Sequence, residues 1–396
     1  MTATTLTTTA PTTGRTARPR LITRPLLLRF VSIVACSVGF FLPLAVVPLL
    51  AESASPIAGG LANGALLGAT VAGELVSPWL MQRLGARVVL ASGLILLGAP
   101  TFLLLGSSSV PALVAVGVLR GLGFALAIVA GGAVTAALVP TERRGEGLAV
   151  AGLVSAVPSL IALPLGVTLT AAAGPALVFW IAGAAPLLAL ATVAGLPGRS
   201  LRPASPVEAA SAGILAGLRS PSILRPALVF AASAAVAGVV VTCVPGALSG
   251  GAVAFVPALL LVQPATTAVG RWVAGRFGDR VGHRRLFVPG ILLSAAGMAA
   301  LAATSNILLL LAGAALFGLG FGALQNATIA DMYANTDERQ FGTVSALWNA
   351  GYDGGMAVGA LAVSALAALI GSPLAFLILA LALPLALTLV RRHRAA

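Results

Sequence analysis

One stretch decides the fold: Gly275-Arg276-Phe277-Gly278-Asp279-Arg280-Val281-Gly282-His283-Arg284-Arg285. It carries four arginines and one aspartate, and long apolar runs lie on both sides, near residues 251–274 and 286–304. Gly282 suits a tight turn because glycine adopts backbone conformations that other residues rarely adopt. Asp279 is able to cap a neighbouring helix N-terminus and to pair with arginine. The stretch therefore predicts a short basic loop between two membrane helices.

The same pattern occurs 197 residues earlier in a weaker form. Pro78 stands in place of Gly275, and Gln82 stands in place of Asp279. Three residues of the loop recur unchanged, since Arg83, Gly85 and Arg87 match Arg280, Gly282 and Arg284. The same offset relates Gly121-Leu122-Gly123-Phe124 to Gly318-Leu319-Gly320-Phe321, Gly145 to Gly342 and Pro48 to Pro245. The chain is therefore a duplication, with halves that match without a gap from the first apolar run to the start of the fifth.

The composition and the placement of charge indicate a membrane protein. Hydrophobic residues make up 59% of the chain and charged residues 8%, whereas a soluble domain carries about 25% charged residues. All 23 basic residues other than histidine are arginines, and nearly all of them fall in every second gap between apolar runs. This is the positive-inside pattern of a chain with both termini in the cytoplasm. A nucleic-acid-binding protein instead clusters its basic residues on one surface. The distribution of the arginines that give the net charge of +13 therefore predicts a lipid bilayer as partner and no nucleic acid.

A helix needs about 20 apolar residues to cross the hydrocarbon core, and the chain has twelve such runs. They lie near residues 27–50, 57–80, 88–106, 111–139, 147–170, 174–196, 226–247, 251–274, 286–304, 307–333, 342–370 and 373–390. The runs are continuous, whereas the strands of a membrane barrel alternate apolar and polar residues. The predicted fold is therefore an all-α membrane protein of twelve helices in two pseudo-symmetric six-helix halves.

The predicted domain boundaries follow from the runs. They are a disordered tail at 1–24, a first half at 25–196, a cytoplasmic linker at 197–225, a second half at 226–390 and a tail at 391–396. Within the linker, residues 206–219 suit a short amphipathic helix on the membrane surface. Cys36 and Cys243 are isolated within two predicted spans, which predicts neither a disulfide framework nor a metal site.

The duplicated halves and the loop signature give the chain a resemblance to the transporters of the major facilitator superfamily. The resemblance implies a monomeric secondary transporter of the plasma membrane, which moves a small-molecule substrate and uses no cofactor beyond a proton gradient. It also implies that the first, fourth, seventh and tenth helices line the cavity, and that the second and eleventh helices meet between the halves. The run from Ser345 to Gly355, with Trp348, Asn349 and Asp353, resembles a bacterial efflux-type subgroup.

The loop signature has two interpretations. In the first, it is a conformational latch that holds the halves together in one state, formed by Gly275, Asp279, Arg280, Gly282, Arg284 and Arg285 with Arg83, Gly85 and Arg87 of the first copy. In the second, it is a solvated basic loop that only enforces topology. The latch is favoured because topology alone needs neither an aspartate nor a glycine. Glu74 and its repeat equivalent Arg271 lie nearer the inner face and are predicted to act as gate or latch residues.

Polar groups at bilayer depth are functional candidates because they are costly to place there. Arg120 and Asp353 lie about nine and eleven residues into their runs from opposite faces, which at about 1.5 Å per residue gives them a shared depth. Asn349 is four residues before Asp353 and lies on the same helical face. The resemblance places Arg120 and two amides of the tenth run, Gln325 and Asn326, at or near the cavity. These five residues are the predicted substrate or coupling site.

Two of the candidate roles stay open at this point. Asp353 either exchanges a proton with the cavity, as a carboxyl group in low dielectric is able to do near neutral pH, or serves as a structural partner of Arg120 or of amides. Ala162-Leu163-Pro164-Leu165-Gly166 resembles the Gly-Pro signature of drug/proton antiporters, with Leu163 in place of the expected glycine. Alternatively, Pro158 and Pro164 only kink the fifth helix.

The predicted function is proton-coupled efflux of a drug-like or hydrophobic metabolite by alternating access. Proton-coupled uptake of a small nutrient or metabolite is the alternative. The cavity helices carry few charges, which favours efflux. An enzyme is not expected, because the two histidines lie in cytoplasmic segments and neither a metal-binding spacing nor a nucleophile motif occurs. A sensor without transport activity would carry a soluble signalling domain, and the sequence shows none.

Overall fold

The computed structural model describes residues 22–52, 55, 57–140, 144–196, 216–248, 250–337 and 340–391. Within these residues the chain is helical almost throughout and forms no strand. Twelve of its helical segments are long and apolar enough to cross a membrane. The predicted all-α fold with twelve spans is therefore confirmed. The predicted tails and most of the predicted linker, including residues 206–215, lie outside the described residues.

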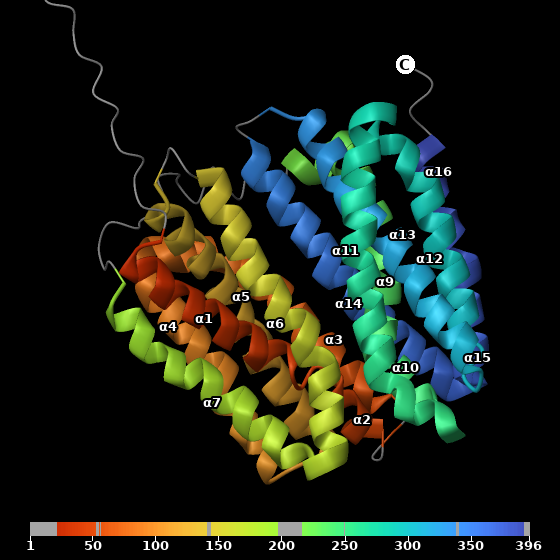
Figure 1. Ribbon diagram of the computed structural model, residues 1–396, viewed down its shortest axis with the longest axis horizontal. Helices are drawn as coiled ribbons and strands as arrows, with labels where there is room; N and C mark the ends of the chain where they lie inside the picture. Colours follow the sequence, from red (N-terminus) through yellow and green to blue (C-terminus); the bar gives the residue numbers. More distant parts are fainter. Residues whose placement is uncertain are drawn as a thin grey trace, which may run out of the picture.

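The first half contains six spans, shown in red to yellow-green in Figure 1. They are α1 (Arg24–Phe41) with α2 (Val46–Glu52), α3 (Ala58–Leu84), α4 (Ala86–Gly98) with the 3-10 helix η1 (Ala99–Leu105), α5 (Val110–Leu138), α6 (Arg144–Ala173) and α7 (Pro175–Ala194).

The second half contains the other six spans, shown in green to blue. They are α9 (Pro221–Thr242) with α10 (Val244–Ala247), α11 (Val256–Val281) preceded by η3 (Gly250–Phe255), α12 (Phe287–Leu301) preceded by η4 (His283–Leu286), α13 (Ile307–Ala334), α14 (Phe341–Ile370), and α15 (Ser372–Ala382) continued by η6 (Leu383–Ala386) and α16 (Leu387–Arg391).

The backbone confirms the duplication. Gly85 and Gly282 both have a left-handed φ, of 84° and 91°, at the turn that ends the second helix of each half. Gly174 and Gly371 share a φ of 81° and 84° before the sixth helix of each half. Each pair is separated by the same 197 residues. The sequence matches end at the start of the fifth run, but the turns at Gly174 and Gly371 lie beyond it. The offset of 197 residues therefore extends to the loop before the sixth helix, where both halves have a turn that needs glycine.

Glycines also set the packing of the helices within each half. A side chain at Gly73 would meet Leu122, and a side chain at the equivalent Gly270 would meet the equivalent Leu319. These contacts bring α3 close to α5, and α11 close to α13, in the same register. Small residues allow such close backbone approach between membrane helices. The two halves therefore repeat individual helix contacts as well as helix order.

The first span of each half is broken near its arginine-free end. A turn at residues 42–45 separates α1 from α2, and Cys243 separates α9 from α10. Pro43 and Pro48 cause the first break, because proline has no N–H group to continue the helical hydrogen bonds. The break leaves backbone carbonyl groups of α1 available to side chains from other helices.

The two halves meet along two pairs of helices. One contact joins α3 to α14, and the other joins α6 to α11. In Figure 1, α6 and α11 lie at the centre of the molecule, and α2 and α10 approach each other at its lower end. The predicted contact between the second and eleventh spans is thus present, since α3 and α14 are these spans.

Candidate functional site

Arg120 of α5 is buried, with 1% of its surface exposed, and it binds the backbone of α1. Its Nη2 donates hydrogen bonds to the carbonyl oxygens of Gly39 at 2.9 Å and Phe40 at 3.4 Å. The helical partner of the Gly39 carbonyl would be the N–H of residue 43, which is a proline. The N–H of Leu44 binds Phe41 instead of Phe40. Arg120 therefore compensates for the break in α1.

This contact argues against one of the open interpretations of Asp353, in which it is a structural partner of Arg120. Among the described residues, no ion pair joins the two side chains, and both hydrogen bonds of the Arg120 side chain go to α1. Burial of a cation without a carboxylate is costly, and backbone carbonyls at a helix break reduce that cost. The helix contacts do not support the predicted shared depth. Gly121 lies against Leu66 of α3, and Gly64 of α3 lies against Leu361 of α14. Arg120 is therefore about two helical turns closer to the arginine-free end than Asp353.

Asp353 and Glu74 lie on α14 and α3, across the contact between the halves. Gly64 of α3 lies against Leu361 of α14. Continuing this antiparallel register places Glu74 opposite residue 351, about half a helical turn closer to the arginine-rich end than Asp353. Helical side chains lean toward the N-terminus of their own helix. Because these N-termini lie at opposite ends, the two carboxyl groups lean toward each other.

Stacked aromatic rings form one wall in the second half. Phe230 of α9 stacks on Trp348 of α14 with ring centroids 4.4 Å apart and on Tyr352 at 5.7 Å. Phe321 of α13 stacks on Phe230 at 5.6 Å, and Phe317 stacks on Phe321 at 5.3 Å. The Trp348 indole also donates a hydrogen bond to a threonine hydroxyl of α13. Trp348 and Tyr352 are half-buried, so this aromatic wall reaches an accessible surface.

A smaller aromatic group occupies the first half. Phe124 of α5 stacks on Phe40 of α1 at 3.7 Å and meets Phe41 edge to face at 6.2 Å. Phe124 is the repeat equivalent of Phe321. The site therefore has aromatic rings at equivalent positions of both halves. In the sequence these two residues stand out only as matches in the repeat, because the rings that stack on them come from helices distant in sequence.

The predicted amides separate into two environments. Gln325 and Asn326 are largely buried, and in each case the side-chain oxygen has no hydrogen-bond partner within the described residues. Asn326 faces Gly275 of α11, inside the second half. Asn349 is exposed on α14. An exposed amide beside half-buried aromatic rings at bilayer depth indicates a water-accessible surface, because polar groups are costly against lipid.

Three described contacts of the loop signature each stay within one half. Arg284 Nε lies 3.8 Å from Asp331 of α13, and Arg87 Nη2 donates a 2.9 Å hydrogen bond to the Ala194 carbonyl. The Arg83 guanidinium lies 4.4 Å from the centre of the Trp79 ring. The side chain of Asp279 lies outside the described residues, and Arg280 and Arg285 are exposed. The role of the signature as a latch between the halves stays a prediction.

In the sequence, Arg29 stands only as one of the basic residues that precede the first span. The structure buries it in α1 and connects it to α5. Its Nε donates to the Gly131 carbonyl at 3.0 Å and to the Thr135 hydroxyl at 3.2 Å, and its Nη1 donates to Ser32 at 2.7 Å. Its position as the third residue of the apolar run near 27–50 is the signal that identifies such a residue. Arg271, in contrast, is exposed on α11.

Pro158 and Pro164 lie inside the continuous helix α6. Pro158 lines a wholly apolar cavity of about 210 Å³ between α6, α1 and α7. This position is compatible with either interpretation of the two prolines. Among the described residues no group of three potential ligands could hold a metal ion.

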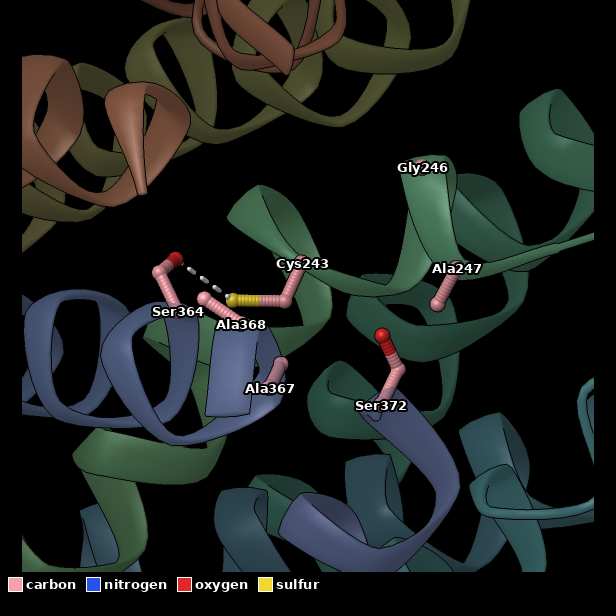
Figure 2. A pocket seen from close by; sticks show the side chains of 7 residues that line it. All are labelled: Cys243, Gly246, Ala247, Ser364, Ala367, Ala368 and Ser372. Carbon is pink, nitrogen blue, oxygen red and sulfur yellow. Dashed lines mark hydrogen bonds between the residues drawn. The ribbon is translucent and has the colours of Figure 1, made fainter. Parts of the chain in front are cut away.

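A second cavity, of about 250 Å³, lies at the arginine-free end of the second half. Figure 2 shows small side chains around it, with Cys243 and Ser364 pointing toward each other. The Cys243 sulfur lies 3.3 Å from the Ser364 hydroxyl. Ser372 on the far side adds a further hydroxyl group. The cavity is polar but carries no charge.

Comparisons with known proteins agree with this architecture. The chain matches the sequence family Major Facilitator Superfamily over residues 29–263 and 247–395. No curated protein matches it. The crystal structure of the nucleoside transporter NupG superposes with a TM-score of 0.77 at 11% identity, covering 94% of this chain and 100% of that one.

Two further solved structures share the fold. One, a peptide transporter POT, has a TM-score of 0.74 at 16% identity and covers 92% of this chain and 93% of its own. The other, the human organic anion transporter MFSD10, has a TM-score of 0.64 at 17% identity and covers 93% and 99%. At these identities the likeness shows the fold. Because the family match spans nearly the whole chain, the protein belongs to the Major Facilitator Superfamily and is a membrane transporter, not an enzyme.

Proposed function

We propose that this transporter is a proton-coupled exporter of small hydrophobic molecules that contain planar rings. The observation that carries the proposal is the pair of aromatic groups around Phe124 and Phe321, at equivalent positions of the two halves. Offset stacking of aromatic rings is favourable beyond the burial of apolar surface. A substrate between two halves that each offer such rings gains these contacts without needing many hydrogen bonds.

The proposed driving force is a proton gradient. Asp353 and Glu74 supply one carboxyl group from each half, at the α3–α14 contact. When one of the two carboxyl groups holds a proton, the two groups do not repel each other. When the proton leaves, both groups are negatively charged and the repulsion returns. Because the two groups belong to different halves, this change acts on the contact that rearranges when the halves rock.

The proposed topology places the arginine-rich loops and both termini in the cytoplasm of a monomer in the plasma membrane. The support is the positive-inside pattern. In a variant without native cysteines, Asp337→Cys should resist a membrane-impermeant thiol reagent in intact cells, whereas Ser108→Cys should react. Both side chains are exposed, so reactivity reports the face of the membrane. The opposite labelling would reverse the topology.

Uptake is the second candidate, and the structural likeness to a nucleoside transporter and a peptide transporter favours it. Accumulation of ethidium and of labelled nucleosides should be compared in cells with and without the protein. Export predicts lower ethidium accumulation that disappears when a protonophore collapses the gradient. Higher nucleoside accumulation with unchanged ethidium would instead support uptake.

The loop signature predicts unequal effects of two substitutions. Asp279→Asn should reduce ethidium export without loss of protein from the membrane, because the second-half copy of the signature is nearly complete. Gln82→Ala should have the smaller effect, because the first-half copy already lacks the aspartate. Export rates normalised to membrane protein test this prediction. Equal effects would count against a latch centred on Asp279.

A further inference from the structure

The two halves are in close contact at the arginine-free end of α3 and α14. A side chain at Gly60 would meet the Ser364 side chain and the Ala360 carbonyl, and one at Gly64 would meet the Leu361 side chain. Neither site leaves room for a Cβ atom without movement of its neighbours. Such small-residue contacts let two membrane helices approach to backbone distance. The halves are therefore closed against each other at this end.

Asn63 lies between these two glycines, and 1% of its surface is exposed. Its Nδ2 donates a 3.0 Å hydrogen bond to the Leu44 carbonyl and a 2.9 Å hydrogen bond to the Thr242 hydroxyl. The helical partner of the Leu44 carbonyl would be the N–H of residue 48, which is a proline. One amide group thus binds the broken first span of its own half and the last residue of α9 in the other half.

The Asn63–Thr242 bond differs from the other contacts near the ends of the helices. Among the hydrogen bonds whose two side chains are both described, it is the one that joins the two halves. The described polar contacts at the arginine-rich end, those of Arg29, Arg87 and Arg284, each stay within one half. Asn63 and Thr242 therefore connect the two halves at the arginine-free end.

The contact between the halves extends from Asn63 to the thiol of Cys243. Thr242 is followed by Cys243, whose sulfur contacts Ser364, and Ser364 in turn lies against Gly60 of the other half. Figure 2 shows that Cys243 and Ser364 together line the cavity at this end. Separation of Gly60 from Ser364 would therefore remove the cover over this side of Cys243.

We propose that Asn63 keeps a gate between the two halves closed at the arginine-free end. Its two hydrogen bonds hold the broken first span of one half against α9 of the other while α3 and α14 are in contact. Opening breaks the bond to Thr242, separates Gly60 and Gly64 from α14 and exposes Cys243. The gate depends on neither the substrate nor the coupling proton of the proposed function.

The test uses Cys243 as the reporter. In a Cys36→Ala variant, Cys243 is the sole thiol, and its labelling by a membrane-impermeant maleimide is measured from each face of the membrane. Asn63→Leu keeps the side-chain size but removes both bonds. Loss of a net hydrogen bond of typical strength should raise the labelling rate about fivefold, only from the face that labels Ser108→Cys. Thr70→Val is the matched control, because this buried α3 hydroxyl bonds only within the first half.

Thr242→Val is the second variant, which removes only the bond between the halves. It should reproduce the increase if Asn63→Leu does not reach the membrane. Unchanged labelling in both variants, an equal increase in Thr70→Val, or an increase from the opposite face would overturn the gate. Since no substrate is added and no gradient is imposed, failure of this test is distinguishable from failure of export or of proton coupling.

Discussion

Asp353→Asn is expected to abolish export driven by a pH gradient while leaving exchange of labelled for unlabelled ethidium intact. The amide keeps the size of the side chain but does not carry the coupling proton. Loss of an essential proton-transfer group lowers rates by on the order of a hundredfold or more. Exchange needs no net proton movement, so it reports binding and conformational change alone. Both rates are measured in vesicles with an imposed gradient.

The Asp353 experiment has two controls. Asp337→Asn removes an acid of the same type from an exposed loop and should leave both rates unchanged. Glu74→Gln should reduce gradient-driven export in the same direction, and the double variant should be no worse than Asp353→Asn, because residues that act as one unit are not additive. Wild-type gradient-driven export by Asp353→Asn would end the coupling hypothesis. Rescue of folding by neutralising Arg120 as well is not expected, since Arg120 binds α1.

The fold followed from the sequence because membrane spans and their duplication are one-dimensional signals. Run length sets each helix, and the glycines at 85 and 282 mark turns that no other residue adopts easily. The structure then placed each span within a few residues of its predicted limits.

Only part of the site could be predicted from the sequence, because local sequence patterns do not show which helices are in contact. Arg120 was identified from its depth, but its partners are carbonyls released by Pro43, eighty residues away in the chain. The proline was visible in the sequence; its proximity to α5 was not. The role of Asn63 does not follow from the sequence, because one amide in an apolar helix is a weak signal until its neighbours are known. The sequence does not identify Phe230 as a site residue, because the rings that stack on it come from α13 and α14.

A cross-link between Asn63→Cys and Thr242→Cys is expected to stop transport almost completely. The two native side chains lie within hydrogen-bond distance, 2.9 Å, and belong to different halves. A short thiol-to-thiol cross-linker in a variant without native cysteines would hold α3 against α9 and keep the arginine-free end closed. Because alternating access requires the halves to separate at this end, both ethidium export and ethidium exchange should fall with the linked fraction, and a reducible linker should restore them after reduction.

The matched control is a cross-link of the same kind inside one half. Ser233 of α9 and Ser294 of α12 are both buried and lie 3.2 Å apart through their hydroxyl oxygens. Linking Ser233→Cys to Ser294→Cys should leave transport unchanged, because these helices move together when the halves rock as rigid bodies. Complete transport with a fully linked Asn63–Thr242 pair would show that the two residues stay together throughout the cycle. The rocking axis would then pass through this end of α3, and the gate would lie elsewhere.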